Sequence, residues 1–240
     1  MKWIIQSLLR PFGYQIHDMR KFGRDPWRDL QILLQSVPAP LCFDVGAHRG
    51  ETLGHIVENF PKATIYAFEP DPDNFAALQK AAAQFPQAKL YSLAMGDSQT
   101  KAMLQKTAFS MSNSILSPET DLKLETHRKI GEVEISVTTL DQFCKEQGIG
   151  NIDLLKTDCQ GFDLRVLRGA SRMLAERRVN IIQCESLFAP EYQGQGWFYE
   201  VLHFLNDSGY APVSFGEPAR NKHHEALWCD VIFKRREPTE

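Results

Sequence analysis

Apolar and polar positions alternate along the chain in blocks that predict strands followed by helices. Short runs that are almost wholly apolar are typical of buried strands, and between them apolar residues recur every three or four positions, as in amphipathic helices. The expected strands are residues 41–45, 63–69, 89–95, 152–158, 179–185, 211–215 and 226–235, and the expected helices are 51–60, 72–85, 139–148, 162–178 and 197–209. This alternation predicts βαβ units, and therefore a doubly wound α/β fold built on a mostly parallel sheet.

Two parts of the chain depart from this rhythm. Residues 1–39 read as a helical segment that packs on the domain, and residues 40–240 form the domain itself. Within the domain, residues from about 97 to 138 read as an insertion of short strands around a polar loop. The apolar positions of residues 1–10 leave a second interpretation open, in which they make a weak contact with a membrane surface. No run of the length needed for a transmembrane helix is present.

Composition and charge exclude several classes of function. The 240 residues carry a net charge of −3, which argues against a nucleic-acid partner because phosphate binding depends on clustered Lys and Arg. The five cysteines are scattered without a CxxC pair, so we expect neither a zinc site nor a disulfide framework. Together with the lack of a signal-peptide pattern, this favours a reducing, cytoplasmic location.

The stretch FDVGAHRGET, residues 43–52, follows the first expected strand and predicts a sharp turn into a helix. Gly46 and Gly50 lack Cβ atoms, so the backbone can turn tightly and let a ligand approach. His48 stands where the dinucleotide fingerprint has its second glycine, which disfavours a pyrophosphate. A ligand without phosphates fits better, and S-adenosylmethionine could place its amino group beside Asp44. The alternative is a tight connection that binds nothing.

The ends of the next two strands add groups suited to a nucleoside. Glu69 follows 19 residues after Gly50, where an acid can accept both ribose hydroxyls. Pro70 is expected to flank the adenine. Asp97 either bonds the adenine amino group or caps a turn.

Several of these motifs resemble the FkbM-type S-adenosylmethionine-dependent methyltransferases, over residues 41 to 188. The resemblance rests on five stretches: FDVGAHRGET, AFEPDPDNF, SMSNSIL, VTTLDQF and IDLLKTDCQGFDLRVLRGA. It implies a class I methyltransferase (Rossmann-like) fold, with seven strands, helices on both faces and an antiparallel last strand. It also implies methyl transfer to oxygen, often on a sugar or secondary metabolite, with S-adenosylhomocysteine as the product.

The resemblance assigns roles to individual residues of this chain. Gly46, Gly50 and Glu69 are implied to contact the cofactor, and Asp158 is implied to lie beside the reacting methyl group. Three neighbours in the same stretches complete the expected cofactor set: His48, Thr52 and Pro70. The chain departs from the family two residues after Asp158, where Gln160 replaces a usual Glu, and this leaves the catalytic role of that position open.

Two acids at adjacent strand ends are the catalytic candidates. An alcohol acceptor has to lose its proton, and a positioned carboxylate is a suitable base. Asp158 is the leading candidate, and its alternative role is the N-cap of the following helix. Glu185 ends the next strand, so the two acids either share the work of the base or hold a divalent cation with waters. A metal is not expected.

Three loops are expected to form the acceptor side. Ser112, Asn113 and Ser114 offer short hydrogen-bonding groups that suit a polyhydroxyl partner. The remaining candidates are Tyr192, which can stack on a ring, and the pair His223 and His224 between the last two strands. Each of these residues has an alternative interpretation as an ordinary loop residue.

The leading hypothesis is an O-methyltransferase acting on a hydroxyl of a small-molecule or glycan acceptor. A nucleotide-dependent oxidoreductase is one alternative, and His48 in the glycine turn counts against it. The other is a methyltransferase-like module that binds the cofactor or a partner without turnover, which Gln160 keeps open.

Overall fold

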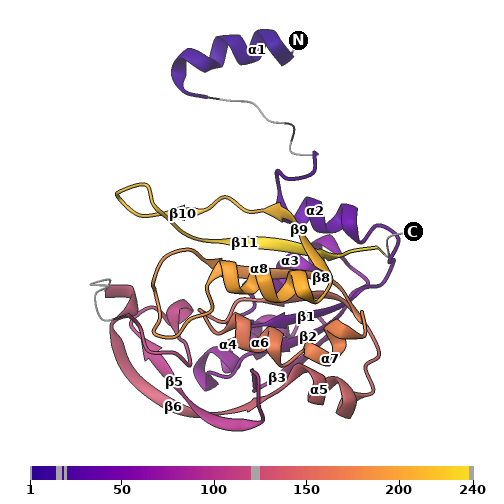
Figure 1. Ribbon diagram of the computed structural model, residues 1–240, viewed down its shortest axis with the longest axis vertical. Coiled ribbons are helices and arrows are strands. Elements are labelled where there is room, and N and C mark those ends of the chain that lie inside the picture. The colour runs from indigo at the N-terminus through magenta and orange to yellow at the C-terminus, as the bar shows by residue number, and fades with distance from the viewer. Residues whose placement is uncertain (1, 15–17, 19–20, 120–124, 238–240) are drawn as a thin grey trace.

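A twisted, mostly parallel sheet forms the centre of the molecule (Figure 1). The computed structural model describes residues 2–14, 18, 21–119 and 125–237. The sheet runs in the order β10-β11-β8-β7-β1-β2-β3, and β9 also pairs with β11. Its strands are β1 (Leu41–Val45), β2 (Thr64–Phe68), β3 (Ala88–Tyr91), β7 (Ile152–Thr157), β8 (Val179–Leu187), β9 (Tyr210–Phe215), β10 (Ala219–Arg220) and β11 (Ala226–Arg235).

The pairing confirms the α/β class and the antiparallel last strand. Strands β3, β2, β1, β7 and β8 are parallel to their neighbours, whereas β11 runs antiparallel to β8, β9 and β10. Among the described residues the sheet has eight strands rather than the expected seven. The additional strand is the short β10, which pairs with β11 beyond the end of β9.

Helices cover both faces of the sheet because side chains along each central strand alternate between two cores. Cys42 of β1 belongs to the core beneath α2 (Pro26–Leu33), α3 (Glu51–Asn59) and α4 (Pro72–Ala82). Its neighbour Phe43 belongs to the core on the other face. That face is covered by α5 (Leu140–Gln147), α6 (Asp163–Arg168), α7 (Ser171–Ala175) and α8 (Phe198–Asp207).

The helix expected over residues 162–178 is interrupted at Gly169, and the single helix is therefore a wrong prediction. A Cβ atom at Gly169 would collide with the backbone carbonyl of Gly96, so the helix approaches a neighbouring loop closely at this point. The carboxylate of Asp141 accepts hydrogen bonds from the backbone of Arg172 and Met173 at 2.8 and 2.9 Å. These bonds satisfy the free N–H groups at the start of α7.

The strand expected over residues 89–95 is divided between two sheets. Its first part is β3, whereas β4 (Ala94–Met95) joins a separate sheet of order β4-β6-β5. Strands β5 (Thr100–Thr107) and β6 (Lys129–Thr138) pair antiparallel within the region expected to be an insertion. The 3₁₀ turns η2 (Ser110–Ser112) and η3 (Glu125–His127) lie between them. The domain limits at residues 39 and 40 stay a prediction.

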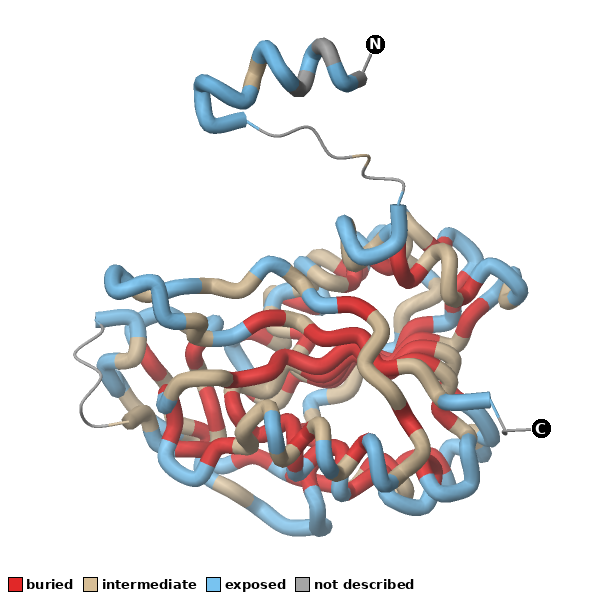
Figure 2. The backbone as a smooth tube through the Cα atoms, turned by 45° about the horizontal axis from the view of Figure 1, so that its top comes forward, coloured by how far each residue is buried: buried red, intermediate tan, exposed pale blue. Residues whose placement is uncertain are grey.

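The two helices of the first 39 residues differ in their packing. Leu30 of α2 is fully buried in the core, and the Asp29 carboxylate accepts hydrogen bonds from Gly23 N and Ser214 Oγ. By contrast, α1 (Lys2–Leu9) and the turn η1 (Arg10–Phe12) lie apart from the sheet (Figure 2). In the described part of the segment α2 thus contributes to the core, whereas α1 lies apart; the packing of residues 1–39 as a unit stays a prediction. No helix in the described part of the chain is long and apolar enough to cross a membrane.

Candidate active site

A cavity of about 640 Å³ opens at the carboxyl ends of the parallel strands. Strand β1 pairs with β2 on one side and with β7 on the other, so the strand order reverses there. In open α/β sheets, ligands bind beyond such a reversal. Residues from the ends of β1, β2, β7 and β8 line the cavity, together with the η2 loop and β11. Its volume lies in the range of sites for small molecules.

The expected glycine turn forms one wall of the cavity. Gly46 has a φ of 87°, and a Cβ atom there would collide with the carbonyl oxygen of Asp158. Asp158 N in turn donates to Val45 O at 3.0 Å, so the turn and the end of β7 are locked together. His48 and Thr52 line the cavity.

Gly50 has a different role from Gly46. Its φ is 98°, and it precedes the first residue of α3. A Cβ atom would lie 3.2 Å from the Leu78 side chain and 3.3 Å from the Ala81 side chain, on the helix α4 side. Gly50 does not line the cavity. It shapes the turn and permits helix packing instead.

A buried carboxylate lies at the end of β1 without hydrogen-bond partners. Asp44 is fully buried, and neither of its carboxylate oxygens has a hydrogen bond among the described residues. Lys156 Nζ approaches Asp44 Oδ1 to 4.0 Å and donates to Asp158 Oδ2 at 3.2 Å. Burial raises the pKa of Asp44 to about 6, and the Lys156 charge offsets only part of this effect. Burial lowers the pKa of Lys156, but the surrounding carboxylates more than compensate and hold it above its ordinary value.

Glu69 lies at the end of β2, where it was expected, and lines the cavity. Its two oxygens accept hydrogen bonds from His48 N at 2.9 Å and from Asp71 N at 2.8 Å. Burial raises its pKa to about 7 despite these bonds. Pro70 also lines the cavity. The structure does not bring Asp97 there, because Asp97 follows β4 of the second sheet and is exposed.

Gln160 links the two candidate acids. Its side-chain nitrogen donates to Asp158 Oδ1 at 3.0 Å and to Glu185 Oε2 at 3.1 Å. Its side-chain oxygen accepts from the Tyr192 hydroxyl at 2.7 Å. Gln160 has a positive φ of 52° in the loop after β7, and Ser114 Oγ donates to its carbonyl at 2.8 Å. Its side chain is therefore held at both the nitrogen and the oxygen of the amide, and its backbone is held by Ser114.

Glu185 lies on β8 among further charged and polar groups. It is buried, and burial together with the charge of Asp158 raises its pKa well above the usual range. Asp230 of β11 is its direct partner in the antiparallel register. Asp230 Oδ2 accepts from Gln183 Nε2 at 3.0 Å, and burial raises the Asp230 pKa as well.

The sequence-based prediction missed three of these groups: Lys156, Gln183 and Asp230. Each is a polar residue within an otherwise apolar strand, and this pattern could have identified all three as candidate site residues. Buried charges need partners, so such residues point to a polar site inside the fold. Which residues they meet depends on the strand pairing, above all for the antiparallel β11.

The η2 loop closes over the glycine turn. Ser112, Asn113 and Ser114 line the cavity as expected, but two of their side chains hold the loop in place. Asn113 Nδ2 donates to Asp71 Oδ2 at 2.7 Å, and Ser114 bonds the loop of Gln160. His48 Nε2 lies 2.9 Å from Ser110 Oγ, which ties the loop to the turn.

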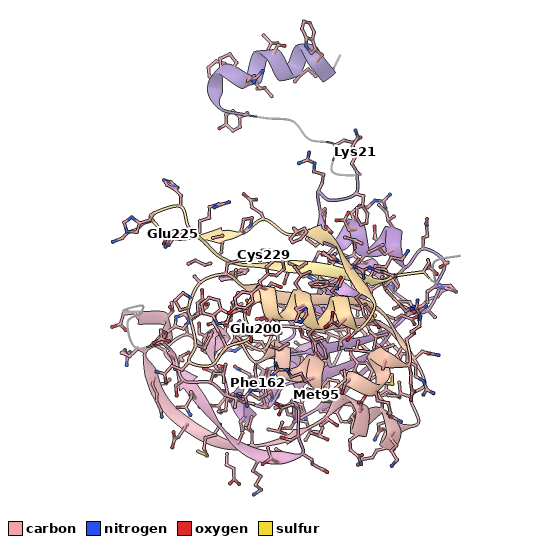
Figure 3. The ribbon with its side chains drawn as sticks, in the orientation of Figure 1. Lys21, Met95, Phe162, Glu200, Glu225 and Cys229 are labelled. Atoms are coloured by element: carbon pink, nitrogen blue, oxygen red, sulfur yellow. The ribbon has the colours of Figure 1, made fainter. Side chains whose placement is uncertain are left out.

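Three expected acceptor residues lie elsewhere. Tyr192 is almost fully buried and holds Gln160 rather than offering an open ring. His223 and His224 are exposed in the hairpin between β10 and β11 and do not line the cavity. The hairpin extends away from the body at Glu225 (Figure 3). Both histidines lie in the turn of this hairpin, where His224 has a φ of 68°.

The mouth of the cavity carries apolar side chains that were not predicted. Phe109, Met111 and Trp228 are partly exposed and line the cavity. Trp27 also lines it and stacks on His55 with ring centroids 5.3 Å apart. Among the described residues, no group of three or more His, Cys, Asp or Glu is arranged to hold a metal ion.

The strand order and the cavity at its reversal define a class I methyltransferase fold. The FkbM methyltransferase from Methylobacillus flagellatus has the same fold, with a TM-score of 0.51 and 14% identity, and the match covers 82% of this chain and 44% of that one. The family model described as the methyltransferase FkbM domain matches residues 44–212. The chain therefore belongs to the FkbM methyltransferase family, and the expected resemblance and enzyme class are confirmed.

Two relatives are similar over most of their length. The 2-O-methyltransferase NoeI of Sinorhizobium fredii is 25% identical over 217 residues, which cover 85% of this chain and 88% of NoeI. The 31-O-demethyl-FK506 methyltransferase FkbM of Streptomyces tacrolimicus is 27% identical over 205 residues, which cover 75% of this chain and 76% of that protein.

Proposed function

We propose that this methyltransferase transfers the methyl group of S-adenosylmethionine to a hydroxyl of a small-molecule or glycan acceptor. The names of both relatives specify transfer to oxygen, which supports the choice of acceptor atom. The observation that carries the proposal is the pair of carboxylates, Asp158 and Glu185, that Gln160 holds together in the cavity beside the glycine turn.

The residues around the glycine turn fit the cofactor. Asp44 does not itself line the cavity, but its buried carboxylate directly precedes the lining residues Val45 and Gly46, lacks a hydrogen-bond partner and suits an ammonium group. Gly46 presents backbone without a side chain, and Glu69 has acceptor capacity left for ribose hydroxyls. When bound, S-adenosylmethionine supplies an electrophilic methyl carbon and a positive sulfonium charge.

Glu185 is the proposed proton acceptor. Its Oε2 accepts from Gln160, whereas no hydrogen bond to its Oε1 is found among the described residues. This oxygen is free to accept the proton of an acceptor hydroxyl. A buried carboxylate with a raised pKa is a stronger base once ionised, and a neighbouring positive charge favours its ionised form.

Asp158 is proposed to position rather than to accept the proton. Both of its oxygens already accept hydrogen bonds, from Gln160 and from Lys156. This arrangement holds the Asp158 carboxyl group at the end of β7, facing the cavity. The sequence favoured Asp158 as the base, and the hydrogen-bond geometry supports Glu185 instead.

The side chains at the cavity mouth support the proposal of an acceptor with an apolar body. Phe109, Met111 and Trp228 provide apolar surface, and Ser112 with the acids behind it provides polar groups. Such a combination orients a ligand by its polar end.

The experiment is calorimetric titration with S-adenosylmethionine and S-adenosylhomocysteine, with NAD as the control. We expect both sulfur ligands to bind and NAD not to bind; no binding of either to folded protein would contradict the proposal. A screen of hydroxylated acceptors with radiolabelled cofactor follows. Glu185→Gln should abolish transfer while S-adenosylhomocysteine still binds, and undiminished transfer in that variant would remove Glu185 from the role of the base.

A further inference from the structure

Exposed apolar side chains are concentrated near the start of the chain. Of the thirteen large hydrophobic residues exposed in the described part of the chain, six lie within residues 3–22. They are Trp3, Ile5, Leu8, Phe12, Tyr14 and Phe22. Figure 2 shows α1 apart from the body of the molecule and mostly exposed. An apolar surface of this kind marks an interaction site.

The same segment has a charge opposite to that of the rest of the chain. Residues 1–24 contain five Lys and Arg against one acidic residue, whereas the remainder contains 22 against 29. Lys21, in the segment between α1 and α2, extends into solvent (Figure 3). A partner surface that complements this segment is therefore negatively charged and also able to accommodate apolar side chains.

We propose that residues 2–14 and 21–24 bind the surface of a bilayer that contains anionic lipids. Trp and Tyr rings settle at the level of the lipid headgroups, aliphatic side chains enter the acyl boundary, and Lys and Arg pair with lipid phosphates. Ile5 and Leu8 lie three positions apart in α1 and so share one face of the helix. Each basic residue near an anionic bilayer adds to the electrostatic attraction that holds the segment there.

This segment leads directly into the proposed active site. Pro26 and Trp27 line the cavity, and Trp27 lies within about 11 Å of Arg24 even if the chain between them is fully extended. Phe109, Met111 and Trp228, which also line the cavity, expose further apolar side chains. A bilayer-bound segment would thus hold the cavity near the membrane. This inference rests on the proposed O-methylation. The acceptor would then be a lipid-linked molecule that carries the hydroxyl to be methylated.

The test is co-sedimentation of the full chain with phosphatidylcholine vesicles, made with and without phosphatidylglycerol. We expect binding that requires phosphatidylglycerol and weakens with salt. Ile5→Glu combined with Leu8→Glu should weaken it by about tenfold or more, as should Arg10→Glu combined with Lys21→Glu. Met103→Glu combined with Ile130→Glu is the matched control, because these exposed residues lie on β5 and β6, and it should bind as the unmodified chain does.

Several outcomes would overturn the inference. They are no sedimentation with anionic vesicles, equal binding to neutral vesicles, or equal losses in the α1 and control variants. Self-association that Ile5→Glu with Leu8→Glu abolishes, without vesicle binding, would make a second copy the partner instead. Titration of the same variants with S-adenosylhomocysteine separates the two proposals: its failure in the unmodified chain refutes the proposed function, whereas intact titration without vesicle binding refutes only this inference.

Discussion

The side-chain nitrogen of Gln160 donates a hydrogen bond to Glu185 Oε2 at 3.1 Å, and the same nitrogen reaches Asp158 Oδ1 at 3.0 Å. An uncharged amide thus lies between two carboxylates. The resemblance to the FkbM-type methyltransferases implies an acid at this position. Because Tyr192 fixes the other end of the amide, both N–H groups are directed at the acids. With Gln160 in place of an acid, the site holds two carboxylates, and a third would add electrostatic repulsion between them.

Gln160→Glu should destabilise the ligand-free protein by about 2–4 kcal/mol at pH 8, because it removes two donors and adds a third carboxylate beside the partly buried Asp158 and the buried Glu185. The cost should be smaller at pH 5. When folding raises the pKa of a carboxyl group, the free energy of unfolding falls as the pH rises from the unfolded pKa through the folded pKa of that group. Urea unfolding at both pH values checks this. The exposed Gln84→Glu is the control and should change stability by no more than about 0.5 kcal/mol.

Asp44→Asn should stabilise the ligand-free protein at pH 8 by about 1–2 kcal/mol. The fold raises the pKa of Asp44 from 3.8 to about 6, so the cost of its charge begins above pH 3.8 and is complete above pH 6. The gain should therefore vanish near pH 3.5, and thermal unfolding at the two pH values measures it. The same variant should bind S-adenosylmethionine more weakly. A gain that persists at low pH would show that ionisation of Asp44 is not its cause.

Gly46→Ala should destabilise the protein by about 3 kcal/mol or more, because the added methyl group meets the Asp158 carbonyl and φ is positive. Gly54→Ala is the matched control. Gly54 lies inside α3 with open space around it, so alanine should stabilise the helix by about 0.5–1 kcal/mol. Denaturant unfolding of both variants gives the comparison, and equal effects would remove the close approach as the reason for Gly46.

Glu69→Ala should weaken S-adenosylhomocysteine binding by about 1–3 kcal/mol if Glu69 holds the ribose. Asp97→Ala should leave binding unchanged, because Asp97 is exposed and outside the cavity. Calorimetric titration distinguishes them. The assignment of Glu69 fails if its variant binds like the unmodified chain, and the exclusion of Asp97 fails if its variant binds weakly.

Local patterns in the sequence determined the parallel strands, the turn and the acids that follow them. The apolar run at residues 41–45 and the glycines after it place a tight strand-to-helix turn without reference to any distant residue. Glu69, Asp158 and Glu185 could be predicted to meet because parallel strands end at one edge of a sheet.

Contacts between residues far apart in the sequence decided the rest. Asp230 faces Glu185 only because of the antiparallel register of β11, and Gly169 ends a helix because the loop at Gly96 lies against it. Tyr192 is a support for Gln160 rather than part of an acceptor wall, since it is packed inside the core. Neither hydrophobic periodicity nor local propensity predicts these pairings, because they form only when elements far apart in the sequence pack against one another in the core.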